Sequence, residues 1–114
     1  MKLIELAYFT DNVQQMADFY GGLLGTEPVA KSDDMAIFIS GETKIFIHLK
    51  YAPAEGELPA DSHIAFAVDD VDATCEALTQ RGLTLEVPPQ DYYWGRSAYL
   101  RDPDGHMVEI TKAS

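Results

Sequence analysis

Four side chains in the sequence could together hold a divalent metal ion: the carboxylates of Glu5 and Glu109 and the imidazoles of His48 and His63. Two nitrogen and two oxygen donors suit Zn, Ni, Mn, Co or Fe(II). A carboxylate beside such an ion can also serve as a general base. The alternative is that each residue is an ordinary polar residue facing solvent, so the elements that carry the four residues decide between the two interpretations.

The four residues occur in segments where large apolar side chains alternate with other types, at about 2–9, 43–50, 62–68 and 106–112. Such alternation is typical of strands with one buried face. In the first segment, Leu6 and Tyr8 would pack on a helix, whereas Glu5 would point to the opposite face. The same argument places the other three candidates on the face that no helix covers.

The chain also reads as two copies of one unit. A shift of 58 residues lays Glu5-Leu6-Ala7-Tyr8 over His63-Ile64-Ala65-Phe66. A shift of 61 lays Phe46-Ile47-His48-Leu49 over Met107-Val108-Glu109-Ile110. Glu5 is then equivalent to His63, and His48 to Glu109. A pseudo-twofold relation between the copies would bring all four side chains together.

Each copy contains one amphipathic helix. The first begins after Asp11 or Asn12, ends at Gly25 and carries apolar residues at helical spacing, namely Val13, Met16, Phe19, Tyr20, Leu23 and Leu24. The second spans about 70–81 and is capped by Asp69 or Asp70.

The remaining β-favouring segments predict strands near 26–32, 35–40, 83–88 and 96–101. The expected fold class is α+β, with two βαβββ modules in tandem. The modules span about 1–50 and 62–114 of a single domain, 1–114, and the proline- and acid-rich residues 51–61 form the loop between them.

Charge and cysteine content exclude several classes of protein. Lys and Arg number 8 and Asp and Glu 19, a net charge of −11 that phosphate backbones and anionic lipids would repel. We therefore expect neither nucleic acid nor a membrane as partner. The single cysteine, Cys75, allows no intrachain disulfide and no cysteine-based zinc site. Without an apolar leader or membrane span, the expected location is cytoplasmic.

Three groups of motifs extend over nearly the whole chain: Asp18-Phe19-Tyr20 with Leu23-Leu24-Gly25, His63-Ile64-Ala65-Phe66-Ala67-Val68, and Trp94-Gly95-Arg96 leading to Asp102-Pro103-Asp104-Gly105-His106 and Glu109. With them the chain resembles the vicinal oxygen chelate superfamily, which includes glyoxalase I, bleomycin-resistance proteins, fosfomycin-resistance transferases and extradiol dioxygenases. The resemblance implies sheets that curl around a shared pocket, often completed by module exchange in a dimer. It also implies that the four candidates occupy metal-ligand positions of the family. Glu5 stands at the first of these positions, and His48 stands at the second, where glyoxalase I has a glutamate.

Several positions depart from the family's known enzymes. Phe9 and Ala52 stand where glyoxalase I has residues that contact glutathione, and Pro89 stands where fosfomycin transferases have a lysine. A glutathione hemithioacetal is therefore not the expected substrate.

A pocket for a small molecule is expected to be lined by the aromatic and hydroxyl side chains of Phe9, Tyr92, Tyr93, Trp94, Ser97 and Tyr99. Plain packing or a dimer contact is the alternative for the aromatic run at 92–94.

Three functions fit these residues. The first is a divalent-metal-dependent lyase or isomerase that acts on a small oxygenated substrate through a metal-stabilised oxyanion, with Glu109 as general base and Glu5 as second candidate. The second is a metal-free binding protein that sequesters aromatic or cationic compounds. The third is an Fe(II) extradiol-type dioxygenase that uses His48, His63 and Glu109. We also expect a homodimer, because two small modules bury modest surface and leave sheet edges to cover.

Overall fold

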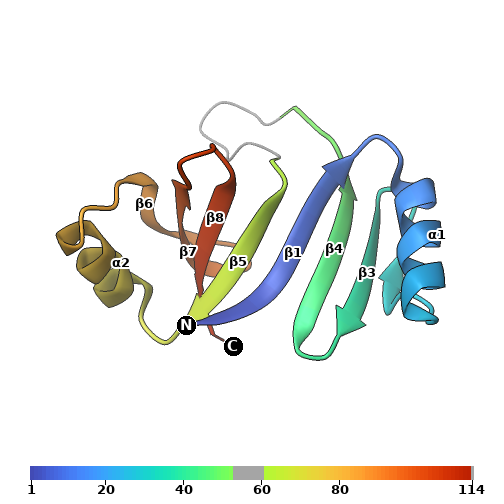
Figure 1. The fold of residues 1–114 in the computed structure, drawn as a ribbon, viewed down its shortest axis with the longest axis horizontal. Helices are drawn as coiled ribbons and strands as arrows, with labels where there is room; N and C mark the ends of the chain where they lie inside the picture. Colours follow the sequence, from blue (N-terminus) through green and yellow to red (C-terminus); the bar gives the residue numbers. More distant parts are fainter. Residues whose placement is uncertain (53–60, 114) are drawn as a thin grey trace. The chain divides into compact units, whose positions relative to one another are not determined.

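The computed structural model describes residues 1–52 and 61–113, and the order βαβββ occurs twice in them (Figure 1). The first series is β1 (Lys2–Thr10), α1 (Val13–Leu24), β2 (Ala30–Lys31), β3 (Met35–Ser40) and β4 (Thr43–Leu49). The second is β5 (His63–Val68), α2 (Val71–Gln80), β6 (Leu85–Tyr92), β7 (Gly95–Arg101) and β8 (Met107–Lys112). The predicted α+β class is confirmed.

The described residues form two compact units: a first unit of residues 5–52 with 61–62, and a second unit of residues 63–113 with 1–4. These bounds differ by a few residues from the predicted modules. Most of the predicted loop, residues 53–60, lies outside the described residues. The single-domain organisation stays a prediction.

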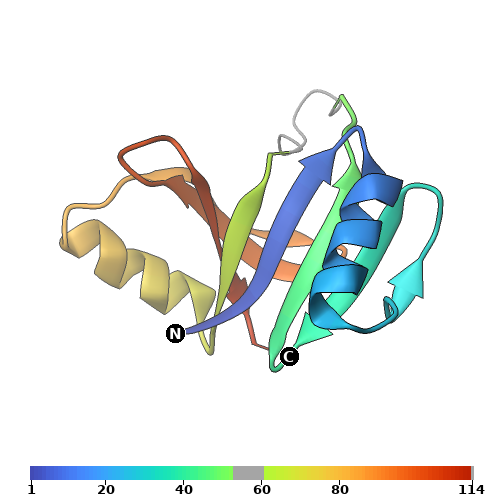
Figure 2. The same ribbon diagram turned by 45° about the vertical axis from the view of Figure 1, so that its right-hand side comes forward.

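The first unit has the strand order β2-β3-β4-β1, in which β1 and β4 are parallel and the other pairs antiparallel. Helix α1 lies against one face of these strands (Figure 2). The core between them contains the buried side chains of Val13, Ala17, Ala36, Phe38, Ile45 and Ile47. Leu6 and Tyr8 pack on this core, as the alternation of β1 predicts, so Glu5 points to the face opposite the helix.

The second unit repeats the plan with the strand order β5-β8-β7-β6 and a parallel β5–β8 pair. Its core joins α2 to one face of the sheet through the buried residues Val68, Val71, Cys75, Ala98, Leu100 and Ile110. His63 and Glu109 alternate with these core positions and so lie on the other face. Cys75 is therefore a small core residue, as expected.

The register of the strands corrects the repeat alignment. Glu5 lies opposite Lys44 in the first unit, and its equivalent His63 lies opposite Met107 in the second. Strand β4 is thus equivalent to β8 with a shift of 63 residues, not 61. The residue equivalent to Glu109 is Phe46, whereas His48 is equivalent to Thr111.

Three element predictions need correction. The strand expected at 26–32 is reduced to Ala30–Lys31, because Thr26 N–H closes the end of α1 by bonding Gly21 O and Pro28 has no N–H. Strand β6 continues past residue 88 through Pro89, which an edge strand tolerates where its register shifts. Phe19 and Leu23 on α1 are exposed instead of buried in the core.

The two helices differ in how their first turns are capped. The Asp70 carboxylate accepts a hydrogen bond from Ala73 N–H at 3.0 Å, whereas Asn12 makes no side-chain capping bond within the described chain. We therefore expect Asp70→Ala to lower the free energy of unfolding by about 1 kcal/mol. The matched substitution Asn12→Ala should cost less than half of that. Urea unfolding followed by circular dichroism measures both, and equal losses would contradict the capping role of Asp70.

Among the described residues, no helix has the length and apolar character needed to cross a membrane.

Candidate metal centre

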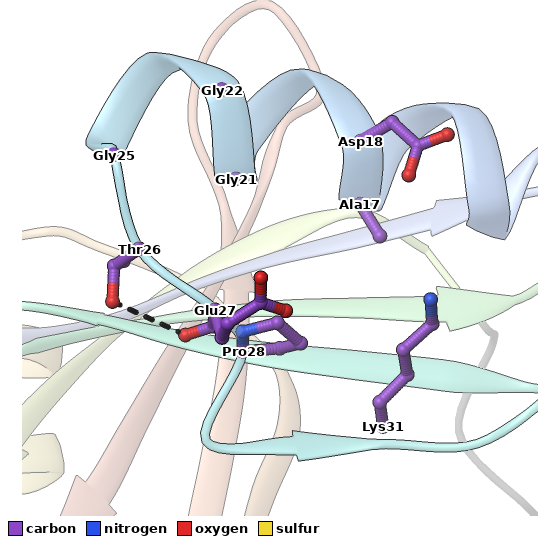
Figure 3. A pocket seen from close by; sticks show the side chains of 9 residues that line it. All are labelled: Ala17, Asp18, Gly21, Gly22, Gly25, Thr26, Glu27, Pro28 and Lys31. Atoms are coloured by element: carbon purple, nitrogen blue, oxygen red, sulfur yellow. Dashed lines mark hydrogen bonds between the residues drawn. The ribbon is translucent and has the colours of Figure 1, made fainter.

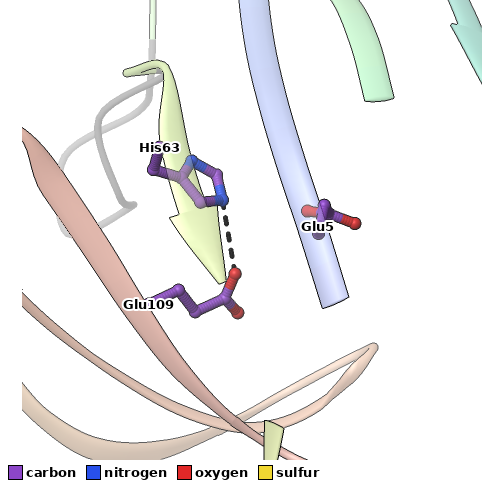
Figure 4. A group of neighbouring side chains, drawn as sticks. All are labelled: Glu5, His63 and Glu109. Atoms are coloured by element: carbon purple, nitrogen blue, oxygen red, sulfur yellow. Dashed lines mark ion pairs between the residues drawn. The ribbon is translucent and has the colours of Figure 1, made fainter. Parts of the chain in front are cut away.

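His63 and Glu109 meet on the helix-free face of the second unit. Strands β5 and β8 pair so that Glu109 lies opposite Ala65. Ala65 is two residues after His63, so His63, Ala65 and Glu109 share one face of the sheet. The His63 Nε2 and Glu109 Oε1 atoms are 3.3 Å apart (Figure 4). Their side chains are 13% and 7% exposed, respectively. Two of the four predicted ligands are therefore brought together in a nearly buried site.

The spacing of these two atoms suits a shared metal ion. A charge-assisted hydrogen bond between nitrogen and carboxylate oxygen is typically about 2.7–2.9 Å long. Two ligand atoms of one tetrahedral zinc ion lie roughly 3.4 Å apart, given bonds of about 2.1 Å. The observed 3.3 Å is compatible with both arrangements, a long hydrogen bond between His63 and Glu109 or two ligands of one ion. The donor types, imidazole nitrogen and carboxylate oxygen, fit a borderline divalent cation.

Glu109 is held by several side chains of its own unit. Its Oε2 atom accepts a hydrogen bond from the Ser97 hydroxyl at 2.8 Å, and Ser97 Oγ also lies 2.9 Å from Thr111 Oγ1. Burial disfavours the charged form of Glu109. The hydrogen bonds from His63, Ser97 and Tyr99 outweigh burial, so the pKa of Glu109 falls below its ordinary value. Glu109 is thus a fixed carboxylate, as a metal ligand must be.

Aromatic rings border this carboxylate. Tyr92 stacks on Trp94 with ring centroids 4.5 Å apart, and Tyr99 makes edge contacts with both Tyr92 and His63. The charge of Glu109 adds to burial in raising the pKa of Tyr92. Tyr92, Trp94 and Tyr99 were predicted to line a pocket, and the structure gathers these three side chains near Glu109. Tyr93, on the same turn, is almost fully exposed.

An arginine fixes the start of strand β7, next to Ser97. The Arg96 guanidinium donates two hydrogen bonds to Asp72 on α2, at 2.7 and 2.9 Å, and one to Asp91 on β6 at 3.0 Å. The hydrogen bond from Arg96 holds the pKa of Asp72 below its usual range. Because three elements meet at one side chain, the backbone beside Ser97 has a defined position.

Glu5 lies on β1 in the first unit and is mostly buried. Its Oε2 atom forms an ion pair with Lys44 Nζ at 3.0 Å on the neighbouring strand β4. Glu5 occupies the same place in β1 that His63 occupies in β5. Its partner Lys44 has an apolar equivalent, Met107, in the second unit.

His48 lies at a distance from Glu5 within the first unit. It is opposite Phe9, four residues along β1 from Glu5, which corresponds to about 13 Å. Its ring contacts the rings of Phe9, Phe46 and Tyr51, and its Nδ1 lies 2.7 Å from Leu49 O. The structure therefore does not bring Glu5 and His48 together, and Phe9 belongs to this aromatic cluster.

Sequence reasoning did not identify Thr111, Arg96 or Lys44 as neighbours of the site. Thr111 could have been identified from the sequence, because alternation along β8 places it on the same face as Glu109. No pattern in the sequence indicates that Arg96 bonds Asp72, because those residues are far apart along the chain.

A separate cavity of about 450 Å³ opens in the first unit, beside the C-terminal half of α1 (Figure 3). It is lined by Ala17, Asp18, Gly21, Gly22, Gly25, Thr26, Glu27, Pro28 and Lys31. None of the predicted ligands lines it. The small residues leave space there because they have little or no side chain, and this accounts for the cavity without a ligand.

Comparison with known proteins agrees with this architecture. A Bacillus subtilis protein, YraH, is 31% identical over 98% of both chains. The metallothiol transferase FosB of Shouchella clausii is 27% identical, over 92% of this chain and 75% of its own length. A probable lactoylglutathione lyase of Vibrio parahaemolyticus is 42% identical, but over only 45% of this chain and 38% of its own length.

The model of one protein family matches residues 2–110, nearly the whole chain. This match covers both βαβββ series and both residues of the His63–Glu109 pair. The chain belongs to the Glyoxalase/Bleomycin resistance protein/Dioxygenase superfamily.

Proposed function

We propose that the protein is a divalent-metal-dependent lyase or isomerase acting on a small oxygenated substrate. The observation that carries the proposal is the nearly buried His63–Glu109 pair, whose donor atoms have the spacing of two ligands of one ion. A relative named as a metallothiol transferase supports metal dependence within the family.

His63 and Glu109 would hold the ion, and Glu5 stays the predicted third donor. The repeat supports Glu5, since it has the same place in β1 as His63 has in β5. His48 is the fourth candidate, and its register beside Phe9 gives it the least support. When bound, the ion supplies Lewis acidity toward a substrate oxygen.

The two carboxylates suit different roles. Glu109 has a lowered pKa and accepts hydrogen bonds on its carboxylate, so it is a weak base and a good ligand. We therefore assign proton abstraction to Glu5 in preference to Glu109, which reverses the order expected from the sequence.

Exchange of substrate hydrogen for solvent deuterium tests this function without knowledge of the product. The zinc-, nickel- or manganese-loaded protein is incubated in D2O with a panel of small hydroxyaldehydes, hydroxyketones and 2-oxo acids, and proton NMR follows the C–H signals next to the carbonyl. We expect metal-dependent loss of signal for at least one compound. Glu5→Gln should slow this exchange at least about 100-fold, because a general base contributes roughly 10²–10⁴-fold.

Lys31→Gln, in the separate cavity, is the control and should leave the exchange rate unchanged. Absence of exchange from the whole panel with every metal would contradict the proposal. Exchange that persists in Glu5→Gln but is lost in Glu109→Gln would return the base to Glu109.

A metal-free binding protein is the second candidate function. The specific observation in its favour is the Tyr92–Trp94 stack, which offers an aromatic surface close to the carboxylate of Glu109 in a chain of net charge −11. Such a surface suits a flat cation. Quenching of Trp94 fluorescence by an aromatic cation in the presence of EDTA, retained in His63→Ala, would favour it. Quenching that needs added metal would exclude sequestration of this kind.

The predicted homodimer and the extradiol alternative remain predictions. Sedimentation at micromolar concentration decides the first. Aerobic assay of catechols with Fe(II) decides the second.

A further inference from the structure

Three hydrogen bonds meet at Ser97, and two of them link the only tryptophan of the chain to the proposed ligand Glu109. Trp94 Nε1–H donates to Ser97 Oγ at 3.1 Å, Ser97 Oγ lies 2.8 Å from Glu109 Oε2, and Thr111 Oγ1 lies 2.9 Å from Ser97 Oγ. Ser97 is fully buried, so no water competes for these bonds. Trp94 is itself 45% exposed and reaches the surface.

The direction of each bond follows from the chemistry of the groups. An indole N–H can only donate, and an ionised carboxylate can only accept. Ser97 has one hydroxyl proton, which must point to Glu109, since that carboxylate has no proton to give. Thr111 then donates to Ser97, because its other acceptor, Arg96 O, is 3.5 Å away. Ser97 thus accepts from Trp94 and Thr111 and gives its single proton to Glu109.

We propose that Ser97 is a positioning residue for Glu109 and that Trp94 is coupled to the metal ligand through it. The Ser97 hydroxyl bonds Oε2, whereas Oε1 faces His63. Ser97 thus orients the Glu109 carboxylate so that Oε1 points to the side on which His63 would hold an ion. This proposal rests on the metal binding of the proposed function. It adds that Ser97 holds the ligand Glu109 and that Trp94 responds to metal binding through Ser97.

Coupling through Ser97 has a consequence for substrate contact. The indole of Trp94 stacks on Tyr92 at the surface while its N–H bonds inward to Ser97. A molecule that moves the indole would lengthen the bond that Trp94 donates to Ser97, the hydroxyl that in turn donates to Glu109. Trp94 therefore connects the aromatic surface to the strength of the metal ligand.

Zinc titration of the folded full-length protein tests the role of Ser97. Isothermal calorimetry on wild type, Ser97→Ala and Thr111→Val gives the affinity for zinc alone. We expect Ser97→Ala to weaken zinc binding about 10- to 100-fold, the loss typical when a partner of a ligand is removed. Thr111→Val is the matched control, since it removes a neighbouring buried hydroxyl but leaves the Ser97–Glu109 bond, and should change affinity less than about 3-fold.

The coupling of Trp94 has a readout of its own in the wild type. Because the chain has one tryptophan, its ¹⁵N-labelled form gives a single indole N–H cross-peak. Zinc should shift this peak with the same concentration dependence that calorimetry gives. In Ser97→Ala the shift should disappear at saturating zinc. The wild-type spectrum serves even if Ser97→Ala fails to fold.

The outcomes separate the two proposals. Zinc binding that is equal in wild type and Ser97→Ala, or an indole peak that zinc leaves unmoved, overturns the inference and leaves the metal site standing. A wild type that binds no zinc, nickel, cobalt or manganese overturns both.

Discussion

Replacing His63 by alanine should lower the affinity for zinc by more than about 100-fold, beyond the 10- to 100-fold typical for a partner of a ligand. The physical reason is that His63 supplies the nitrogen donor that the described part of the chain places beside Glu109, at 3.3 Å from its Oε1. Wild type at a zinc concentration 100 times its dissociation constant should gain about 2.7 kcal/mol of stability. Thermal unfolding with and without zinc measures this gain, and His63→Ala should lose nearly all of it.

His106 provides the matched control for that substitution. Its side chain is 75% exposed, bonds Asp102 in the turn before β8, and faces no predicted ligand that the structure describes. His106→Ala should therefore bind zinc as wild type does. If His106→Ala and His63→Ala lose the same affinity, zinc binds exposed imidazoles in general and the metal centre is not where we place it.

The helix-free face of each sheet could be predicted from the sequence, because alternation along a strand is a property of two neighbouring residues. The placement of His63 and Glu109 on one face follows from it directly. The position of His48 could not be predicted in the same way. Shifts of 61 and 63 residues differ by one full strand period, so both put every side chain on the same face. Only the hydrogen-bonded register separates them, and it aligns Phe46 with Glu109.

The hydrogen bonds around Glu109 are a second feature that the sequence alone could not predict. Ser97 was expected to line the pocket, but its role as the donor to Glu109 depends on the pairing of β7 with β8, where it lies opposite Thr111. The bond from Trp94 further depends on the tight turn into β7. Such contacts join residues that no local sequence pattern relates, so these hydrogen bonds could be identified only from the pairing of the strands.

Phe38→Ala should lower the free energy of unfolding by about 3–5 kcal/mol, the cost of removing a large aromatic side chain from a core. Phe38 is 0% exposed and lies in the first unit among Ala17, Ile45 and Ile47. Urea unfolding followed by circular dichroism measures the loss. Ile39→Ala, at the next position on the same strand, removes a side chain that is 47% exposed and should cost less than about 1 kcal/mol.

Phe38→Ala also tests whether 1–114 is a single domain. Each unit has its own core, and Trp94 lies in the second unit, whereas Phe38 lies in the first. In a cooperative domain every probe reports one transition. Fluorescence of Trp94 should then shift its urea midpoint in Phe38→Ala by as much as circular dichroism does, although the substitution is in the other unit. A Trp94 midpoint that stays at the wild-type value would show that the two βαβββ units unfold independently. Each unit's own core would then have to be sufficient to keep it folded.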